Sequence, residues 1–410
     1  MLFLKVYFNR KFITDLTWIA GQARNDINLF MNKENKIKRI GIDARFYGPL
    51  GKGLGRYTQE VVDNIIKLDR DNEYVIFLRQ ENFSAFKCDG LRVKKVLADI
   101  RWYGLAEQIV FPFYIWRQRL DLMHFPHFNV PIFCPVKFIV TIHDLILIKF
   151  PTLRATTLGP VIYKIKNLAY KIVISLAIKR SKKVLAVSGY TKKEIVKQFK
   201  TNPEKIIVTY EGVAELTKIN EPVDINEVLN KYNISQPYLL YVGNAYPHKN
   251  LEGLIEIFPE IIKNHPDLKL ILVGKEDYFY GRLKQFAKIF SSNIIFPGYV
   301  PDNELKALYA GAALYVFPSF YEGFGLPPLE AMAHGLAVVS SNKTCLPEIL
   351  GPAASYFNPS DKMDMKYAIE KALADKASQE NLKSRGYEQI KKYSWTDCAE
   401  KTLEVYKNLL

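Results

Sequence analysis

The sequence predicts an α/β protein made of two doubly wound, Rossmann-like domains that face each other across a cleft. Short apolar stretches of strand length alternate with amphipathic stretches of helix length, which is typical of a parallel sheet covered by helices on both faces. This alternation restarts after a segment bracketed by Pro222 and Pro237. A chain of 410 residues also exceeds one ordinary hydrophobic core and suits two domains.

The first expected domain covers residues 38–215 and begins with a buried strand at 38–44. A glycine-rich loop at 48–55 follows, and then a helix from about residue 56 to 68. We expect further strands at 74–78, 93–96, 122–125, 138–142 and 183–187, and helices at about 103–119 and 158–181. Residues 1–37 have no long apolar region and no small-residue cleavage site, so we expect a poorly ordered extension rather than a signal peptide.

The second expected domain covers residues 216–393, of which 216–236 are expected to form a linker. Its strands are expected at 238–242, 268–273, 294–296, 313–317 and 337–340, with helices between them. A last amphipathic helix, at about 394–410, is expected to use Ser394 as its N-cap and to pack back on the first domain. Ligands bind at the carboxyl ends of the strands in sheets of this class, so we expect the functional site in the cleft.

Positive charge is concentrated in the first half of the chain. Residues 1–215 hold 36 Lys and Arg against 19 Asp and Glu, a balance of +17, whereas residues 216–410 hold 21 against 23, a balance of −2. This asymmetry favours a partner with many negative charges, either an anionic membrane surface or nucleic acid. No known nucleic-acid-binding module can be recognised, so we expect no nucleic-acid partner. The sequence contains no run of 18 or more apolar residues without charges, so we expect no membrane-spanning helix.

The expected helix at 158–181 carries basic residues among apolar ones, and Trp116, Arg117 and Arg119 come earlier in the same domain. This helix could dock on an anionic membrane, or it could pack into the core with its lysines in solvent. Its basic residues are Lys164, Lys166, Lys171, Lys179 and Arg180. The four cysteines lack disulfide or metal spacing and are expected to be buried free thiols in a reducing compartment: Cys88, Cys134, Cys345 and Cys398.

The most informative segment is residues 318–335, PSFYEGFGLPPLEAMAHG. A strand runs into a loop containing Gly323 and Gly325, which lack side chains and therefore let the backbone approach a ligand. The loop then enters a helix whose first turn suits the two prolines. The N–H groups of the loop, including those of Phe324 and Leu326, would face an anion at the helix N-terminus.

Two carboxylates accompany this helix start. We expect Glu322 to stand free in the loop and Glu330 to lie in the first helical turn. Two glutamates separated by seven residues are a weak signal alone, but the strand, glycines, prolines and the following Ala-Met-Ala-x-Gly make the pattern specific. Together these features resemble the signature of retaining glycosyltransferases of family 4, a large group of GT-B fold that includes many mannosyltransferases. The resemblance covers about residues 38–410.

Other motifs that resemble this family occur in the expected order. They are 51–57 (GKGLGRY), 141–145 (TIHDL), 187–192 (VSGYTK), 210–213 (YEGV), 298–302 (GYVPD) and 346–348 (LPE). The resemblance implies transfer of a hexosyl group, with mannose favoured, from a nucleotide diphosphate sugar to a glycan or lipid-linked acceptor. It also implies retention at the anomeric carbon, with no metal ion and no other cofactor.

The resemblance also implies roles for single residues of the second domain. Glu330 would bind the ribose hydroxyls of the donor nucleotide. Glu322 would bind hydroxyls of the transferred sugar and favour the positive charge that develops at its anomeric carbon. The loop N–H groups would hold the donor sugar and diphosphate, and they belong to Gly323, Phe324, Gly325 and Leu326.

In the first domain, the resemblance places His143 beside the transferred sugar, with Asp144 next to it in the substrate-binding set. Gly53 and Gly55 would let the backbone approach the donor phosphates ahead of the following helix.

The phosphate-binding residues depart from the family pattern. Many relatives place an Arg and a Lys after the first strand of the second domain, where both neutralise the leaving diphosphate. Here Lys249 fits the Lys position, but Asn244 or His248 occupies the position of the Arg. Since the resemblance implies no metal ion, protein cations and helix N-termini must balance the diphosphate charge. We therefore expect weaker or altered donor binding, unless His248 is protonated when the donor binds.

The remaining histidines have other expected roles. His124 and His127 have a spacing that would suit a metal on a helix, but Pro126 breaks the helix and no acidic ligand follows. We expect them in a first-domain loop that faces the acceptor. His334 is expected to serve packing.

Two other classes of function stay open. One is a sugar-nucleotide epimerase or a phosphorylase of the same architecture, of which the phosphorylase would need a lysine-bound pyridoxal cofactor. The other is a basic nucleic-acid-binding protein, whose binding would weaken steeply with salt, although the paired glutamates argue against it. We expect the glycosyltransferase to act in the cytoplasm, on the inner face of the plasma membrane, in assembly of a surface polysaccharide or glycolipid.

Overall fold

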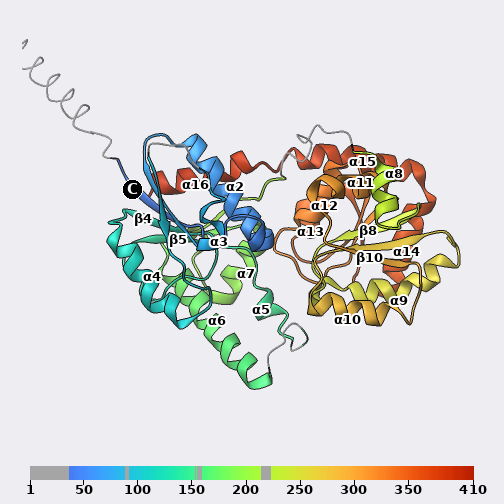
Figure 1. The fold of residues 1–410 in the computed structure, drawn as a ribbon, viewed down its shortest axis with the longest axis horizontal. Helices are drawn as coiled ribbons and strands as arrows, with labels where there is room; N and C mark the ends of the chain where they lie inside the picture. Colours follow the sequence, from blue (N-terminus) through green and yellow to red (C-terminus); the bar gives the residue numbers. More distant parts are fainter. Residues whose placement is uncertain (1–36, 88–91, 153, 155–158, 214–222) are drawn as a thin grey trace, which may run out of the picture.

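The computed structural model describes residues 37–87, 92–152, 154, 159–213 and 223–410. These residues form two α/β domains that lie side by side, each built around one sheet (Figure 1). The predicted class, two doubly wound α/β domains, is therefore confirmed. The expected N-terminal extension lies outside the described residues except for Ile37, and so does Cys88.

The first domain contains a seven-stranded parallel sheet with the order β3-β2-β1-β4-β5-β6-β7. Its strands are β1 (Arg39–Asp43), β2 (Glu73–Leu78), β3 (Val93–Leu97), β4 (Leu122–Phe125), β5 (Phe138–Ile142), β6 (Lys183–Ala186) and β7 (Ile206–Val208). Its helices are η1 (Pro49–Gly51), α2 (Lys52–Leu68), α3 (Gln80–Phe83), α4 (Leu105–Arg117), α5 (Ile146–Lys149), α6 (Pro160–Arg180), α7 (Gly189–Phe199) and η3 (Pro203–Lys205).

The second domain contains a six-stranded parallel sheet with the order β10-β9-β8-β11-β12-β13. Its strands are β8 (Tyr238–Val242), β9 (Lys269–Val273), β10 (Ile294–Gly298), β11 (Leu314–Phe317), β12 (Val338–Ser341) and β13 (Ala354–Phe357). Its helices are α8 (Ile225–Lys231), η5 (Pro247–Lys249), α9 (Leu251–Ile262), α10 (Tyr278–Ala287), α11 (Asp302–Gly311), α12 (Leu326–Ala333), α13 (Leu346–Leu350), η6 (Gly351–Ala353), α14 (Lys362–Ala374) and α15 (Lys376–Ile390), and α16 (Trp395–Lys407) follows.

Every strand that the sequence predicts is present, within a residue or two of the expected bounds. The sequence does not predict β7 or β13, which are short strands at outer edges of the two sheets. The expected linker is partly helical, because Asp224 caps α8 by accepting hydrogen bonds from the N–H groups of Asn226 and Glu227.

The start of α2 differs from the prediction. We expected a loop up to Gly55, but the helix already begins at Lys52, so Gly53 and Gly55 lie in its first turn. Gly55 packs directly against the loop after β1, where a Cβ on it would lie 2.1 Å from the carbonyl oxygen of Gly48. Glycine is needed at position 55 for close packing and not for a loop conformation. The glycine-rich composition of this segment therefore wrongly predicted a loop up to Gly55.

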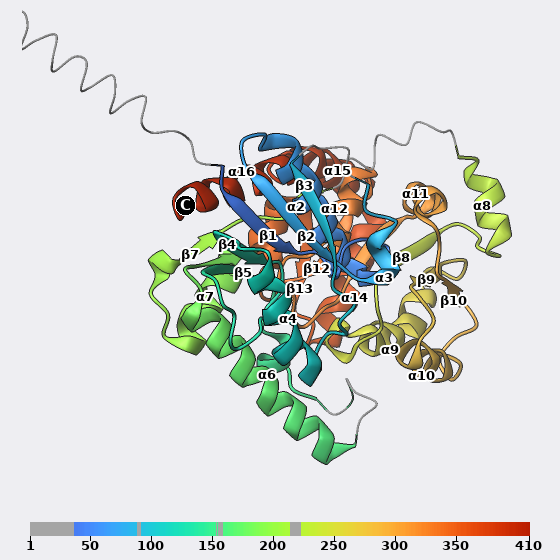
Figure 2. The same ribbon diagram turned by 60° about the vertical axis from the view of Figure 1, so that its left-hand side comes forward.

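The helices of the first domain cover two different faces of its sheet. Side chains of α4 and α6 pack with one set of alternate strand residues, which includes Val75 and Phe77. Helix α2 and the chain-terminal α16 pack on the other face, against residues such as Ile40 and Ile76. Figure 2 shows α4 and α6 next to each other, away from α16.

The last helix, α16, leaves the second domain and packs against α2 of the first. Ser394 caps it, because its Oγ accepts hydrogen bonds from the N–H groups of Thr396 and Asp397. Near its end, the hydroxyl of Tyr406 lies 2.7 Å from Nδ1 of His124 in β4. The predicted N-cap is thus confirmed, and the helix adds a polar contact inside the first-domain core.

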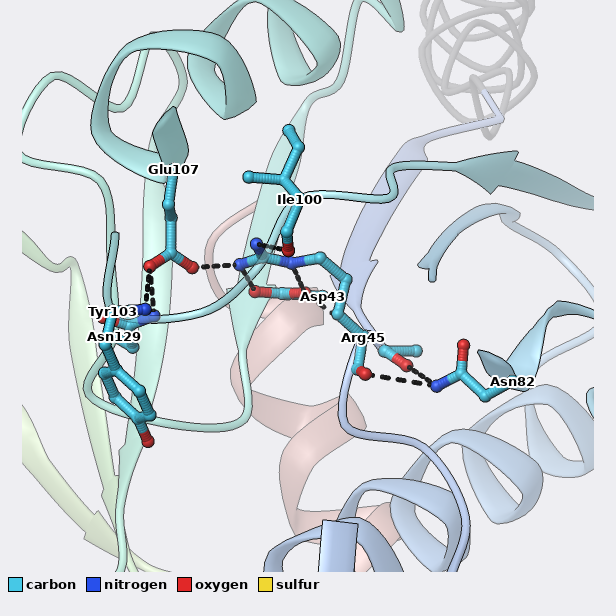
Figure 3. Close-up of polar contacts among 8 residues, drawn as sticks. Asp43, Arg45, Asn82, Ile100, Tyr103, Glu107 and Asn129 are labelled. Carbon is cyan, nitrogen blue, oxygen red and sulfur yellow. Dashed lines mark hydrogen bonds and ion pairs between the residues drawn. The ribbon is translucent and has the colours of Figure 1, made fainter. Parts of the chain in front are cut away.

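A buried ionic cluster connects β1 to α4 (Figure 3). The Arg45 guanidinium contacts Asp43 at 2.7 Å and Glu107 at 2.6 Å, and all three side chains are buried. The other oxygen of Glu107 accepts hydrogen bonds from Asn129 and from the N–H of Tyr103. Because every member has a partner, the cluster fixes where the chain leaves β1 and enters the loop that leads to α2.

Candidate functional site

The predicted loop and helix lie at the point where the strand order of the second sheet reverses. Strands β8 and β11 are neighbours, while the chain continues outward from them on opposite sides. The segments that follow these two strands, 243–250 and 318–325, therefore meet at the carboxyl edge of the sheet. This switch point is the usual ligand-binding position in doubly wound sheets.

Glu322 does not stand free, contrary to the prediction. Its Oε1 lies 2.6 Å from Nζ of Lys249, and both side chains are mostly buried. Its backbone N–H donates to the hydroxyl of Thr344. The structure thus brings together the two charged residues expected on the sugar and on the diphosphate, and pairs them with each other.

Glu330 lies in the second turn of α12 and not in the first, because the helix begins at Leu326. Its Oε1 lies 2.6 Å from Nη1 of Arg56, which comes from α2 of the first domain. Burial raises the pKa of Glu330, and the nearby Arg56 offsets part of this rise. This ion pair joins the two domains across the cleft.

Two glycines determine the backbone of the loop between Glu322 and α12. Gly325 precedes the helix with φ of 100°, a left-handed conformation that favours glycine. Gly323 packs against the first domain, where a Cβ on it would lie 2.0 Å from the carbonyl oxygen of His143. Phe324, Gly325 and Leu326, at the start of α12, line a cavity together with residues of the first domain.

His143 is held by two acceptors. Its Nδ1 lies 3.1 Å from Oε1 of Glu211, and its Nε2 lies 2.9 Å from the carbonyl oxygen of Pro126. Both ring nitrogens can serve these acceptors only as donors, which requires the imidazolium form. Burial lowers the pKa of His143, but the Glu211 carboxylate and the Pro126 carbonyl outweigh it, so the pKa is raised. Asp144 beside it accepts a hydrogen bond from the N–H of Ile146, and burial raises its pKa.

A cavity of about 250 Å³ is lined by predicted site residues of both domains, although Gly55, Lys249 and Glu330 are not among them. Its lining comes from both sides of the cleft: Gly53, Leu54, His127, His143, Asp144, Val187, Glu211, Glu322, Gly323, Phe324, Gly325, Leu326 and Pro327. A larger cavity of about 630 Å³ lies between residues 149–152 and 154 on one side and the helices α9 and α10 on the other, and none of the residues predicted for the site lines it. We place the site in the smaller cavity, because it holds the loop amides and the carboxylate.

Asn244 and His248 do not line either cavity. The backbone carbonyl oxygen of Asn244 accepts a hydrogen bond from the Tyr241 hydroxyl. The side-chain oxygen of Asn244 accepts one from the N–H of Tyr246. His248 is buried, and burial together with the nearby Lys249 lowers its pKa to about 4. Its imidazole is therefore neutral at pH 7 in this structure, and neither residue supplies the missing positive charge.

The predicted acceptor-facing loop at His124 is wrong. His124 lies inside β4 and contacts Tyr406 and the Thr141 hydroxyl, so it belongs to the core. His127 is partly buried and lines the smaller cavity. His334 stacks on Tyr309, with ring centroids 5.0 Å apart, which confirms its packing role.

Sequence reasoning missed two residues of the site. Glu211 belongs to the quoted YEGV motif, but nothing in the sequence connects it with His143, 68 residues away. Arg56 ends a glycine-rich motif, and its contact with Glu330 spans 274 residues. Both contacts form only when strands and domains come together.

Comparisons with known proteins identify both halves of the chain. Residues 51–215 match the model of Glycosyltransferase Family 4, and residues 224–389 match the model of Glycosyl transferases group 1. O-antigen chain mannosyltransferase B of Escherichia coli is 36% identical over 233 residues, which are 56% of this chain and 61% of that protein. The chain spans less than two thirds of the length of the first curated relatives that it matches.

Solved structures share the fold at low sequence identity. Sucrose-phosphate synthase from Thermosynechococcus elongatus has a TM-score of 0.71 at 18% identity, over 91% of this chain and 99% of that one. Anabaena Alr3699/HepE, in complex with UDP and glucose, has a TM-score of 0.66 at 17% identity, over 90% of this chain and 99% of that one. With a family 4 domain followed by a group 1 domain, this chain belongs to the glycosyltransferases of GT-B fold.

Proposed function

We propose that this chain is a retaining glycosyltransferase that transfers a hexosyl group from a nucleotide diphosphate sugar to a glycan or lipid-linked acceptor, without a metal ion. The observation that carries the proposal is that Glu322 and the N-terminus of α12 line one cavity with His143, while Lys249 pairs with Glu322 from behind that lining. Mannose is the favoured sugar, because the O-antigen relative is a mannosyltransferase.

The contacts of the free protein suggest how the donor would be held. The diphosphate would draw Lys249 from Glu322, which frees that carboxylate for the hydroxyls of the sugar. The Glu322 carboxylate would then favour the positive charge at the anomeric carbon in an oxocarbenium-like transition state. Glu330 would accept hydrogen bonds from the ribose. Gly53 and the α12 amides would approach the phosphates, whereas Gly55 packs against the loop after β1.

A panel of nucleotides tests this function. We expect either UDP or GDP, and its sugar conjugates, to raise the midpoint of thermal unfolding, because a ligand bound only by the folded state stabilises it, by about 2.7 kcal/mol at 100 times Kd. The best donor should then give a product whose NMR spectrum shows the anomeric configuration of the donor, with EDTA present. A Glu330→Ala variant serves as the control and should lose the shift. A wild-type protein stabilised by no nucleotide would contradict the proposal.

We further propose that the first domain brings this site to an anionic membrane. The outward sides of α4 and α6 form an apolar-basic surface, on which Leu105, Trp116 and Ile165 are 83%, 63% and 64% exposed. Its large apolar residues are Leu105, Ile109, Phe113, Trp116, Val161, Ile162, Ile165 and Leu168. Helix α6 has five basic and no acidic residues. The simple core-packing interpretation of α6 is therefore incomplete, because only one side of the helix is buried.

The apolar-basic surface matches an anionic bilayer through its apolar side chains and through its lysines. Exposed apolar side chains gain from burial among acyl chains, and lysines beside them are attracted by anionic headgroups. None of the helices within the described residues is long and apolar enough to cross a bilayer, so docking would occur from one side. A lipid-linked acceptor would then lie next to the first domain.

Vesicle flotation measures this docking. We expect the protein to float with vesicles containing about 30 mol% phosphatidylglycerol and to stay behind with pure phosphatidylcholine. The double variant Ile165→Asp, Leu168→Asp should lose about tenfold or more in partitioning, since both side chains are exposed before docking. Ile289→Asp, at an equally exposed position on the second domain, is the matched control. Equal flotation of all three proteins would contradict docking through this surface.

A further inference from the structure

The proposed donor site lacks one positive charge in the second domain. Of the three residues predicted for the phosphates there, Asn244 is uncharged and His248 is neutral at pH 7. Lys249 alone is cationic, and Glu322 already neutralises it in the free protein. A nucleoside diphosphate carries more negative charge than one lysine balances, so another group must contribute.

Arg56 is placed to contribute from the opposite side of the cleft. It lies in the second turn of α2, and its Nη1 reaches across to Oε1 of Glu330 at 2.6 Å. Glu330 is mostly buried, whereas the Arg56 side chain is 30% exposed. The guanidinium is thus anchored at the carboxylate assigned to the donor ribose, while part of the side chain stays exposed to solvent.

We propose that Arg56 is the second cation of the donor site and binds the diphosphate. This inference rests on the proposed function. A guanidinium carries five N–H donors in a planar fork, and one of them bonds Glu330 in this structure. The remaining edge can bind phosphate oxygens while the first edge keeps Glu330, which a lysine in the same place could not do.

The surroundings of Arg56 favour an anion. Gly53 and Leu54, less than one helical turn before it, line the 250 Å³ cavity together with the loop amides that precede α12. No side chain caps the N-terminus of α2 or that of α12. The first turns of both helices line the same cavity, and Arg56, which does not line it itself, adds a full charge two residues after Leu54.

One consequence concerns the two domains. Lys249 and Arg56 belong to different domains, so a diphosphate held by both would connect them. Donor binding should therefore stabilise the closed arrangement of the domains in which Arg56 contacts Glu330.

The test compares ligands that do and do not carry the diphosphate. We expect Arg56→Ala to weaken binding of the preferred nucleoside diphosphate, UDP or GDP, by about 10- to 100-fold in calorimetry. Binding of uridine or guanosine, followed by ligand-detected NMR, should change little. Arg56→Lys should give an intermediate loss. Lys67→Ala, which removes an exposed cation from the far end of α2, is the matched control and should bind like wild type.

Two results would overturn the proposed role of Arg56 in binding the diphosphate. Equal loss for the diphosphate and the nucleoside would show that Arg56 only positions Glu330 on the ribose, and would overturn the proposal. Unchanged diphosphate binding would also overturn it. Unfolding curves establish whether the variants are folded. If Arg56→Ala does not fold, the diphosphate and nucleoside affinities of Arg56→Lys, which keeps the ion pair to Glu330, provide the test instead. A wild-type protein that binds neither UDP nor GDP contradicts the proposed function itself.

Discussion

Replacement of Lys249 by alanine is expected to lower kcat/KM for the nucleotide sugar by about 10²- to 10³-fold, the cost typical of losing one preorganised electrostatic contact at a reacting centre. The Lys249 ammonium lies 2.6 Å from Oε1 of Glu322, which itself lines the cavity with the loop residues. Its removal takes away the cation expected on the leaving diphosphate. It also leaves the Glu322 carboxylate buried without its partner, so the free energy of unfolding should fall as well.

Calorimetric donor affinity and steady-state kinetics measure this effect together. Lys263→Ala is the matched control, because Lys263 directly follows the neighbouring helix α9, is exposed and pairs with the exposed Glu260. It should leave both quantities unchanged. Unchanged donor affinity in the Lys249 variant would show that Lys249 does not bind the donor and that its role is limited to the ion pair with Glu322.

The second large effect concerns stability. Arg45→Met should lower the free energy of unfolding by about 3–5 kcal/mol, because it leaves Asp43 and Glu107 buried near each other without a cation. Urea unfolding at pH 7 measures the loss. Lys391→Met, which breaks an exposed pair with Glu388, is the control and should cost at most about 1 kcal/mol.

The same variant should respond to pH in a defined direction. Burial already raises the pKa of Glu107, and Arg45 is the main group that opposes this rise. Without Arg45 the pKa of Glu107 in the folded state rises further above its unfolded value. A carboxyl of this kind stabilises the fold only when protonated, so the deficit relative to wild type should shrink as the pH falls towards that pKa. A deficit that stays constant would contradict the proposed role of the cluster.

Most of the fold could be predicted from the sequence because its strands are buried on both faces. Strands such as β5 (FIVTI) and β8 (YLLYV) are continuous apolar runs of strand length between polar or proline-containing segments. The edge strands β7 and β13 were missed because they are only 3 and 4 residues long and less completely buried. Local composition carries little information about such strands.

Within the site, the sequence predicts what one segment can form by itself. The loop, the prolines and the helix of residues 318–335 are all local, and the structure has them. The pairing of charges is not local. Lys249 with Glu322, and Arg56 with Glu330, join segments 73 and 274 residues apart, and no periodicity or motif specifies such contacts. The same holds for Gly55, whose need for close packing looks like a loop signal in the sequence.

The return of α16 to the first domain affects how this protein matures on the ribosome. Helix α2 covers part of one face of the first sheet, but the part under residues such as Leu403 and Tyr406 lacks its cover until residues 395–407 have been synthesised. The second domain can complete its own core earlier, although it is made later. Folding of the amino-terminal domain therefore finishes last, and a ribosome that stalls late would leave a chain whose exposed sheet invites chaperones or aggregation.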